Sequence, residues 1–121
     1  MSINYAWNVK AARMEAVRAL LDGGHLVLLD SDGVKRIGDI QLERTSGTVL
    51  SGLLMLAGFP KFCEALASGE ITRAALYGPR GDLVGSGLTV GTEKNADIVV
   101  NQVGVEAGNL IKIDAAELRH A

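Results

Sequence analysis

The order of apolar and polar residues divides the chain into one helical segment followed by several short extended segments. In residues 8–21, NVKAARMEAVRALL, apolar side chains recur every three or four positions, which predicts an amphipathic helix. Asn8 can cap its start, and the Gly23-Gly24 pair can take the positive φ that ends a helix. We therefore predict a helix over residues 8–22. The face expected to be buried consists of Val9, Ala12, Ala16, Val17, Leu20 and Leu21.

Two extended segments next in the chain predict a β-hairpin. HLVLLD (25–30) and VKRIGDIQLE (34–43) flank a Ser-Asp-Gly sequence, and Asp-Gly is a favoured pair in hairpin turns. The second segment alternates only in part. A bulge near Gly38 would bring Ile37 onto the same face as Ile40, so we expect one there.

A second hairpin is predicted by EITRAALYG (70–78) and DLVGSGLTV (82–90), which flank a Pro-Arg-Gly turn. The apolar face of the latter segment consists of Val84, Leu88 and Val90. Its glycines belong to GSGLTVG (85–91), which superficially resembles a nucleotide-binding loop. Such a loop follows a strand and opens a helix, whereas these glycines lie inside a strand, where they indicate a bulge or a close backbone approach.

The remaining segments complete a mainly β pattern. ADIVVNQVGV (96–105) and LIKIDAAEL (110–118) predict two strands joined by a turn, and FPKFCEALASG (59–69) predicts a short helix starting near Pro60. We expect an antiparallel β-sandwich or jelly-roll-like barrel of six to seven strands, preceded by the N-terminal helix. Residues 8–121 would form one domain, with residues 1–7 as an N-terminal arm.

The segment TVLSGLLMLAGF (48–59) is more apolar than a half-buried strand requires. It is shorter than the roughly 20 residues of a membrane span, so it predicts a strand with apolar groups on both faces. Either a helix or loop of this chain covers the outer face, or a neighbouring subunit does. Aromatic residues of the arm could also anchor on a partner. The predicted interface residues are Tyr5, Trp7, Leu53, Leu54, Met55, Leu56, Phe59 and Phe62.

Composition narrows the class of protein. The 121 residues suit one domain, and 15 glycines against two prolines fit a β protein with many tight turns. A net charge of −2 without a run of Lys or Arg gives no reason to expect nucleic-acid binding. The lone Cys63 excludes an internal disulfide and a multi-cysteine zinc site. Because no secretory signal is visible, we expect synthesis in a cytoplasm.

Three acidic residues are the best metal candidates, because hard cations take several carboxylate oxygens. They are Asp30, Asp32 and Asp39. The Asp-Ser-Asp-Gly sequence lacks the further ligand spacing and terminal Glu of a calcium loop, and turn formation accounts for its residue types. We therefore expect no metal site and no cofactor.

Other chemical groups are few. Cys63 could pair with His25 or His120 only through the fold, because no local catalytic motif surrounds any of them. The ordinary interpretation is a packed thiol and two structurally placed imidazoles. Arg80-Gly81-Asp82 matches a tripeptide that adhesion receptors recognise, and it is also an ordinary hairpin tip. We expect no catalytic residue.

Three stretches together resemble a family of small virion-associated proteins of tailed bacteriophages. They are RMEAVRALLDGGHLVLLDSDG, GEITRAALYGPRGDLVGSGLTVGT and ADIVVNQVGVEAGNLIKIDAAEL. The family's closing pattern is carried by Ala96, Asp97, Ile98, Val99 or Val100, Asn101, Val105 and Gly108. The middle of the chain, residues 43–69, departs from it. The resemblance implies a structural role in the virion.

The expected function is therefore that of a non-enzymatic capsid decoration or cement protein, located on the virion. Its partners would be further copies of itself, with a trimer favoured, and the major capsid protein, with neither nucleic acid nor membrane involved. A tail or head–tail joining protein fits the same observations. The alternative from another class is a small hydrolase or ligand-binding module that uses Asp30, Asp32 and Asp39, or Cys63 with a histidine.

Overall fold

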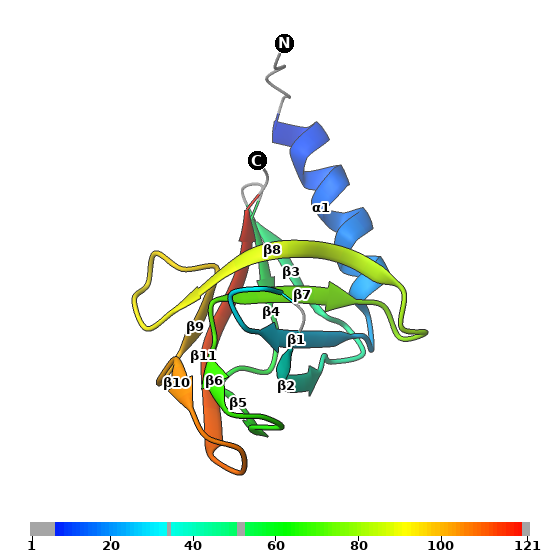
Figure 1. Ribbon diagram of the computed structural model, residues 1–121. Helices are drawn as coiled ribbons and strands as arrows, with labels where there is room; N and C mark the ends of the chain where they lie inside the picture. The colour runs from blue at the N-terminus through cyan, green and yellow to red at the C-terminus, as the bar shows by residue number, and fades with distance from the viewer. Residues whose placement is uncertain (1–6, 34, 51–52, 120–121) are drawn as a thin grey trace.

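The computed structural model describes residues 7–33, 35–50 and 53–119, and these form one helix and eleven strands (Figure 1). The elements are α1 (Trp7–Leu21), β1 (His25–Leu29), β2 (Arg36–Gln41), β3 (Gly47–Leu50), β4 (Leu53–Leu56), β5 (Lys61–Glu64), β6 (Gly69–Glu70), β7 (Arg73–Tyr77), β8 (Leu83–Gly91), β9 (Ile98–Val100), β10 (Gly104–Val105) and β11 (Leu110–Arg119). The predicted mainly β fold with an N-terminal helix is confirmed.

The main sheet has nine strands and curls into an open half-barrel (Figure 1). Eight strands follow the order β2-β1-β7-β8-β9-β11-β4-β3, while β5 pairs with β11, and β10 and β6 form a separate two-stranded sheet. The expected antiparallel pairing holds except between β8 and β9, which are parallel. The strand count exceeds the expected six to seven, because short strands such as β6 and β10 carry too few residues to show alternation.

The hydrophobic core lies on the concave face of the sheet and beneath α1. Strand residues of alternate positions point into it, among them Leu26 and Leu28 of β1 and Ile111 and Ile113 of β11, all of them fully buried. From α1, Met14, Val17 and Leu21 join the same cluster. The helix thus fills the open side of the half-barrel, where inward side chains would otherwise meet water.

The helix begins and ends within one residue of the predicted limits, but its buried face differs from the expected one. Met14 and Leu21 are buried and Val17 is half-buried, whereas Val9 and Leu20 are 39% and 56% exposed. Ala12 and Ala16, also expected inside, are exposed. Apolar residues occur all around this helix, so its own periodicity does not select one face. The large side chain of Met14 fills more of the core than the alanines could.

Both predicted hairpins are present. β1 pairs antiparallel with β2, and the register shift between Leu28 and Leu29 produces the expected bulge, which leaves Ile37 and Ile40 buried in one core. β7 pairs with β8 in the same way, and its register shifts fall opposite the glycines of β8. Gly87 there has a φ of 76°, a conformation that favours glycine.

The helix expected within residues 59–69 is wrong. Residues Lys61–Glu64 form β5, which pairs with β11 so that Cys63 lies opposite Ile111 and Phe62 opposite Lys112. Alternate side chains therefore point toward the core and toward solvent, and the available edge of β11 decides the conformation of a segment too short to form a stable helix alone. The strand expected at 96–105 is also divided, into β9 and β10.

A group of hydrogen bonds joins the end of α1 to the start of β3. Ser46, fully buried, donates its backbone N–H to Asp22 Oδ1 at 2.8 Å and its hydroxyl to the Arg18 carbonyl at 2.8 Å. Arg18 Nη1 in turn donates to both carboxylate oxygens of Asp22, at 3.1 and 3.0 Å. The Ser46 amide, with the Arg18 guanidinium beside it, lowers the pKa of Asp22. This contact sets where the helix sits on the sheet.

We expect Asp22→Asn to lower stability at neutral pH and to weaken its dependence on pH in acid. Because the pKa of Asp22 is lowered by folding, the stabilisation is complete above the unfolded value, near 3.8, and is lost as pH falls through the folded value. Urea unfolding between pH 2.5 and 7 measures the free energy of unfolding of both proteins. The difference between wild type and Asp22→Asn should narrow below pH 4. A difference in the free energy of unfolding that stays constant over this range would contradict the role of the Asp22 charge.

Candidate interaction surface

The leucine-rich strand β4 contributes only half of its predicted interface residues to the surface. Leu54 and Leu56 are 0% and 7% exposed and belong to the core. Met55 is 42% exposed and Leu53 is half-buried on the opposite face. The strand is apolar on both faces, as the sequence predicts. However, Leu54 and Leu56 pack inside this chain and offer no surface to a partner.

The outward side chains of β4 continue into both neighbouring strands. In β3, Leu50 lies opposite Leu53 and is 64% exposed, while in β11, Glu117 lies opposite Met55 and Arg119 opposite Leu53. Since α1 packs into the same core as Leu54 and Leu56, it lies on the inner side and leaves these outward groups uncovered. We call Leu50, Leu53 and Met55 the outer apolar face.

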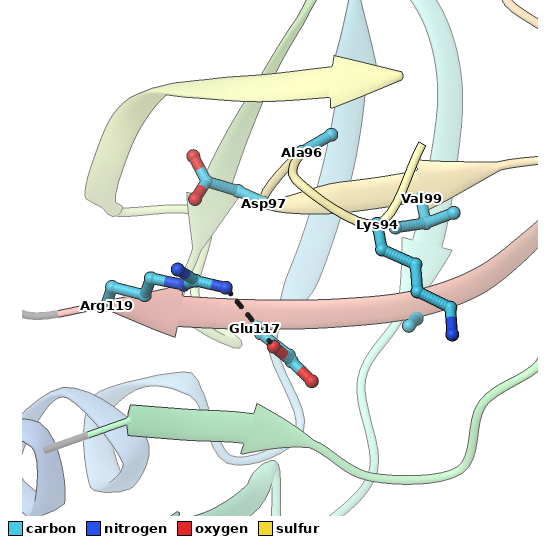
Figure 2. A pocket seen from close by; sticks show the side chains of 7 residues that line it. Lys94, Ala96, Asp97, Val99, Glu117 and Arg119 are labelled. Atoms are coloured by element: carbon cyan, nitrogen blue, oxygen red, sulfur yellow. Dashed lines mark ion pairs between the residues drawn. The ribbon is translucent and has the colours of Figure 1, made fainter. Parts of the chain in front are cut away.

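Beside this face the sheet surface is hollowed (Figure 2). The hollow has a volume of about 430 Å³ and is lined by Lys94, Ala96, Asp97, Val99, Ala115, Glu117 and Arg119. Figure 2 shows small side chains beside charged ones, with Glu117 and Arg119 on β11 and Lys94 on the turn before β9. Glu117 and Arg119 of the hollow lie opposite Met55 and Leu53 of the outer apolar face, so the two regions adjoin and form one surface with an apolar part and a charged part.

The charges in the hollow are weakly engaged within the chain. Arg119 Nη2 lies 4.0 Å from Glu117 Oε2, and both side chains are well exposed, so this ion pair adds little stability. Among the residues that the structure describes, Lys94 has no recorded ion pair. Asp97 differs, because it accepts hydrogen bonds from the backbone N–H and hydroxyl of Thr89 at 3.0 and 3.2 Å. Lys94, Glu117 and Arg119 are therefore available to a partner.

Of the other predicted interface residues, Phe62 and Phe59 lie on neither β3 nor β4. Phe62 is 55% exposed on β5, whereas Phe59 is half-buried against the core. Trp7 is described only by its backbone, as the first residue of α1, and Tyr5 lies outside the described residues. The arm's role as an anchor stays a prediction.

Two of the three acidic metal candidates, Asp30 and Asp39, have partners within the chain. Asp30 forms the β1–β2 turn, where its carbonyl accepts from the Gly33 N–H at 3.0 Å and its carboxylate from the Lys35 N–H at 3.3 Å. Asp39 instead binds His25, with Nδ1 and Oδ1 2.9 Å apart. Within residues 7–33, 35–50 and 53–119, no three His, Cys, Asp or Glu side chains converge as metal ligands.

Cys63 and His25 point to opposite faces of the sheet. The thiol packs against the core near Gly38, and burial raises its pKa, with the Asp39 backbone acting in the opposite direction. A raised pKa disfavours the reactive thiolate. His25 lies on the convex side, where it contacts the exposed Asp39 side chain. Cys63 and His25 are therefore not arranged as nucleophile and base.

The Arg80-Gly81-Asp82 tripeptide lies in the turn between β7 and β8. Gly81 has a φ of 85°, and the Asp82 carbonyl accepts the Gly78 N–H at 2.8 Å. The hydrogen bond and the positive φ are typical of a hairpin turn, and they explain why Gly and Asp occur at these positions.

Sequence reasoning missed Leu50 and the charged residues of the hollow as surface groups. Leu50 precedes a Ser-Gly pair and belongs to a single long apolar segment in the sequence, whereas the structure has two strands there, β3 and β4. The alternation in LIKIDAAELR was visible, and it does place Glu117 and Arg119 on the outer face. What the sequence could not indicate is that β11 lies beside β4.

The chain matches no family model, no curated protein and no solved structure. In the described part of the chain, no helix has both the length and the apolar character needed to cross a membrane.

Replacing neighbouring residues of β4 should separate core from surface. Leu54→Ala should lower the free energy of unfolding by about 2–5 kcal/mol, because it leaves a cavity in the core. Met55→Ala should lower the free energy of unfolding of the isolated chain by less than about 1 kcal/mol, because the side chain is already partly exposed to water. Urea unfolding at low protein concentration measures both. Equal losses for the two variants would contradict the inside–outside assignment.

Proposed function

We propose that this protein is a non-enzymatic structural protein of a tailed-phage virion, and that it acts as a homo-oligomeric capsid decoration or cement protein. The observation that carries the proposal is the outer apolar face, where Leu50 and Met55 are 64% and 42% exposed beside Leu53. Apolar groups gathered on a sheet are typical of surfaces that another protein covers. The family resemblance of the sequence supports the same role.

The surface is suited to contact between proteins. Its apolar part can be buried, while Glu117 and Arg119 next to it can form hydrogen bonds and ion pairs at the rim. Copies meeting through this face would stack sheet against sheet. A β-sandwich of the kind expected from the sequence would then form between subunits rather than inside one.

Strand β3 offers a second mode of association. It is the last strand of the sheet order and pairs only with β4, so one edge of its backbone has no strand neighbour among the described residues. Such an edge can accept a strand from another chain. A trimer would fit the threefold positions of an icosahedral shell, where a cement protein spans joints between capsomers. The major capsid protein is then the second partner.

A tail or head–tail joining role is the alternative within this class, because the same surface would serve there. Copy number separates the two roles. A decoration protein should be present in purified particles in a fixed ratio to the major capsid protein, whereas a joining protein should be present in few copies. Absence of the protein from purified particles would overturn both.

Association in solution provides the direct test of the surface. We expect the wild-type protein to be oligomeric by light scattering, and Leu50→Glu or Met55→Glu to raise the dissociation constant roughly a hundredfold or more, because each would bury an unpaired carboxylate. Met55→Glu also places a second carboxylate opposite Glu117.

Gln41→Glu is the matched control, because Gln41 is exposed on the distant strand β2 and its substitution adds the same charge. Circular dichroism would verify that all three variants fold. A wild-type protein that is a strict monomer at about 100 µM and fails to bind particles would contradict the proposal.

A further inference from the structure

A second hollow lies on the convex side of the sheet, far along the strand order from the outer apolar face. It has a volume of about 290 Å³ and is lined by His25, Val27, Arg36, Asp39, Tyr77, Pro79 and Gly81. Strands β1, β2 and β7 supply its side chains, and the β7–β8 turn supplies one wall. Its size suits a ligand group about as large as an amino-acid side chain.

The floor of this hollow is apolar. Val27 is 1% exposed and forms, with Leu29 and Ala75, a small cluster separate from the main core, against which Tyr77 packs. These residues face outward, yet they are buried because longer side chains of neighbouring strands surround them. An ionic contact made above such a floor is screened less than one on an open surface.

Arg36 is the cation of the hollow, and its charge is not neutralised within the described chain. Its guanidinium carbon lies 5.3 Å from the centre of the Tyr77 ring, a cation–π contact that holds the group in place. No ion pair of Arg36 is recorded in the described ranges. The guanidinium N–H groups are therefore available to donate two parallel hydrogen bonds to a carboxylate.

The carboxylate best placed to pair with Arg36 is engaged elsewhere. Asp39 Oδ1 lies 2.9 Å from His25 Nδ1, and since a carboxylate can only accept, Nδ1 carries the proton. This contact fixes the imidazole ring and leaves Nε2 as its second polar atom. The hollow therefore holds an oriented guanidinium and an oriented imidazole, together with one carboxylate that already has a partner.

We propose that this hollow binds a single carboxylate carried on a short apolar stem. The carboxylate pairs with the Arg36 guanidinium, and the stem packs over Val27 and the Tyr77 ring. Asp39 selects against ligands of higher negative charge, such as phosphate dianions, because a second negative charge would lie near its own. The inference is independent of the proposed virion role. It assigns ligand binding to the His25 region and not to the Asp30 and Asp32 turn.

The probe for this site is butyrate, with butyramide as its neutral counterpart at matched ionic strength. The His25 ring signals report binding by nuclear magnetic resonance, and a His25→Gln sample assigns them against His120, the only other histidine. We expect saturable shifts with butyrate, with a dissociation constant on the order of millimolar. Equal shifts with butyramide, or no shift up to about 50 mM butyrate, would overturn the proposal.

Variants at Arg36 test whether its guanidinium binds the carboxylate. Because the residue is exposed, Arg36→Gln should fold normally and weaken butyrate binding at least about tenfold, with Arg36→Lys intermediate. Tyr77→Phe keeps the aromatic ring and should bind as the wild type does. Unchanged binding in Arg36→Gln would contradict the assignment of the cation.

The source of the carboxylate is tested separately, because it can come from a small molecule or from an acidic side chain of a second copy. Without any probe, His25 signals that move with protein concentration in the wild type but not in Arg36→Gln would identify a second copy as the source. Signals that are constant with protein concentration, with butyrate binding retained, would identify a small molecule as the source.

Discussion

The C-terminal strand β11 is the constraint on which the rest of this structure depends. It is ten residues long and has partners along both edges: β9 on one side, and β5 and then β4 on the other. Its inward residues Ile111, Ile113, Ala116 and Leu118 supply a continuous strip of the core. In the order of the sheet, the β1–β2 and β7–β8 hairpins are joined to β4 and β3 through β9 and this strand.

The position of each side chain relative to β11 and its neighbours decides its role. Because successive residues of a strand point to opposite faces, one apolar run serves both the core and the surface. In β4, Leu54 stabilises the fold while Met55 is left at the surface, and in β11 Leu118 is buried between two charged outward residues. The same alternation separates Cys63, in the core, from Phe62, which is exposed. Two neighbouring residues of one strand, such as Cys63 and Phe62, therefore cannot belong to the same site, because their side chains lie on opposite faces of the sheet.

Much of the fold could be predicted from the sequence, and the failures have physical causes. The helix limits, both hairpins and their bulges follow from local turn chemistry and alternation, which depend on neighbours in the sequence. The strand β5 was mistaken for a helix because its conformation depends on the edge of β11, some fifty residues later. The parallel pairing of β8 and β9 is likewise a product of topology. Of the candidate sites, the apolar strand was identified, whereas the hollows required knowing that Glu117 lies beside Met55 and His25 beside Tyr77.

The central place of β11 has a consequence for how the protein is made. During synthesis the β1–β2 hairpin leaves the ribosome before the other strands, but β4, β5 and β9 lack a common neighbour until residues 110–119 have emerged. Pairings between such distant segments form slowly, and apolar side chains stay exposed to solvent until these pairings are complete. A nascent chain of this protein should therefore depend on its own completion for solubility, and chaperones would have most of its length to recognise before the native sheet can close.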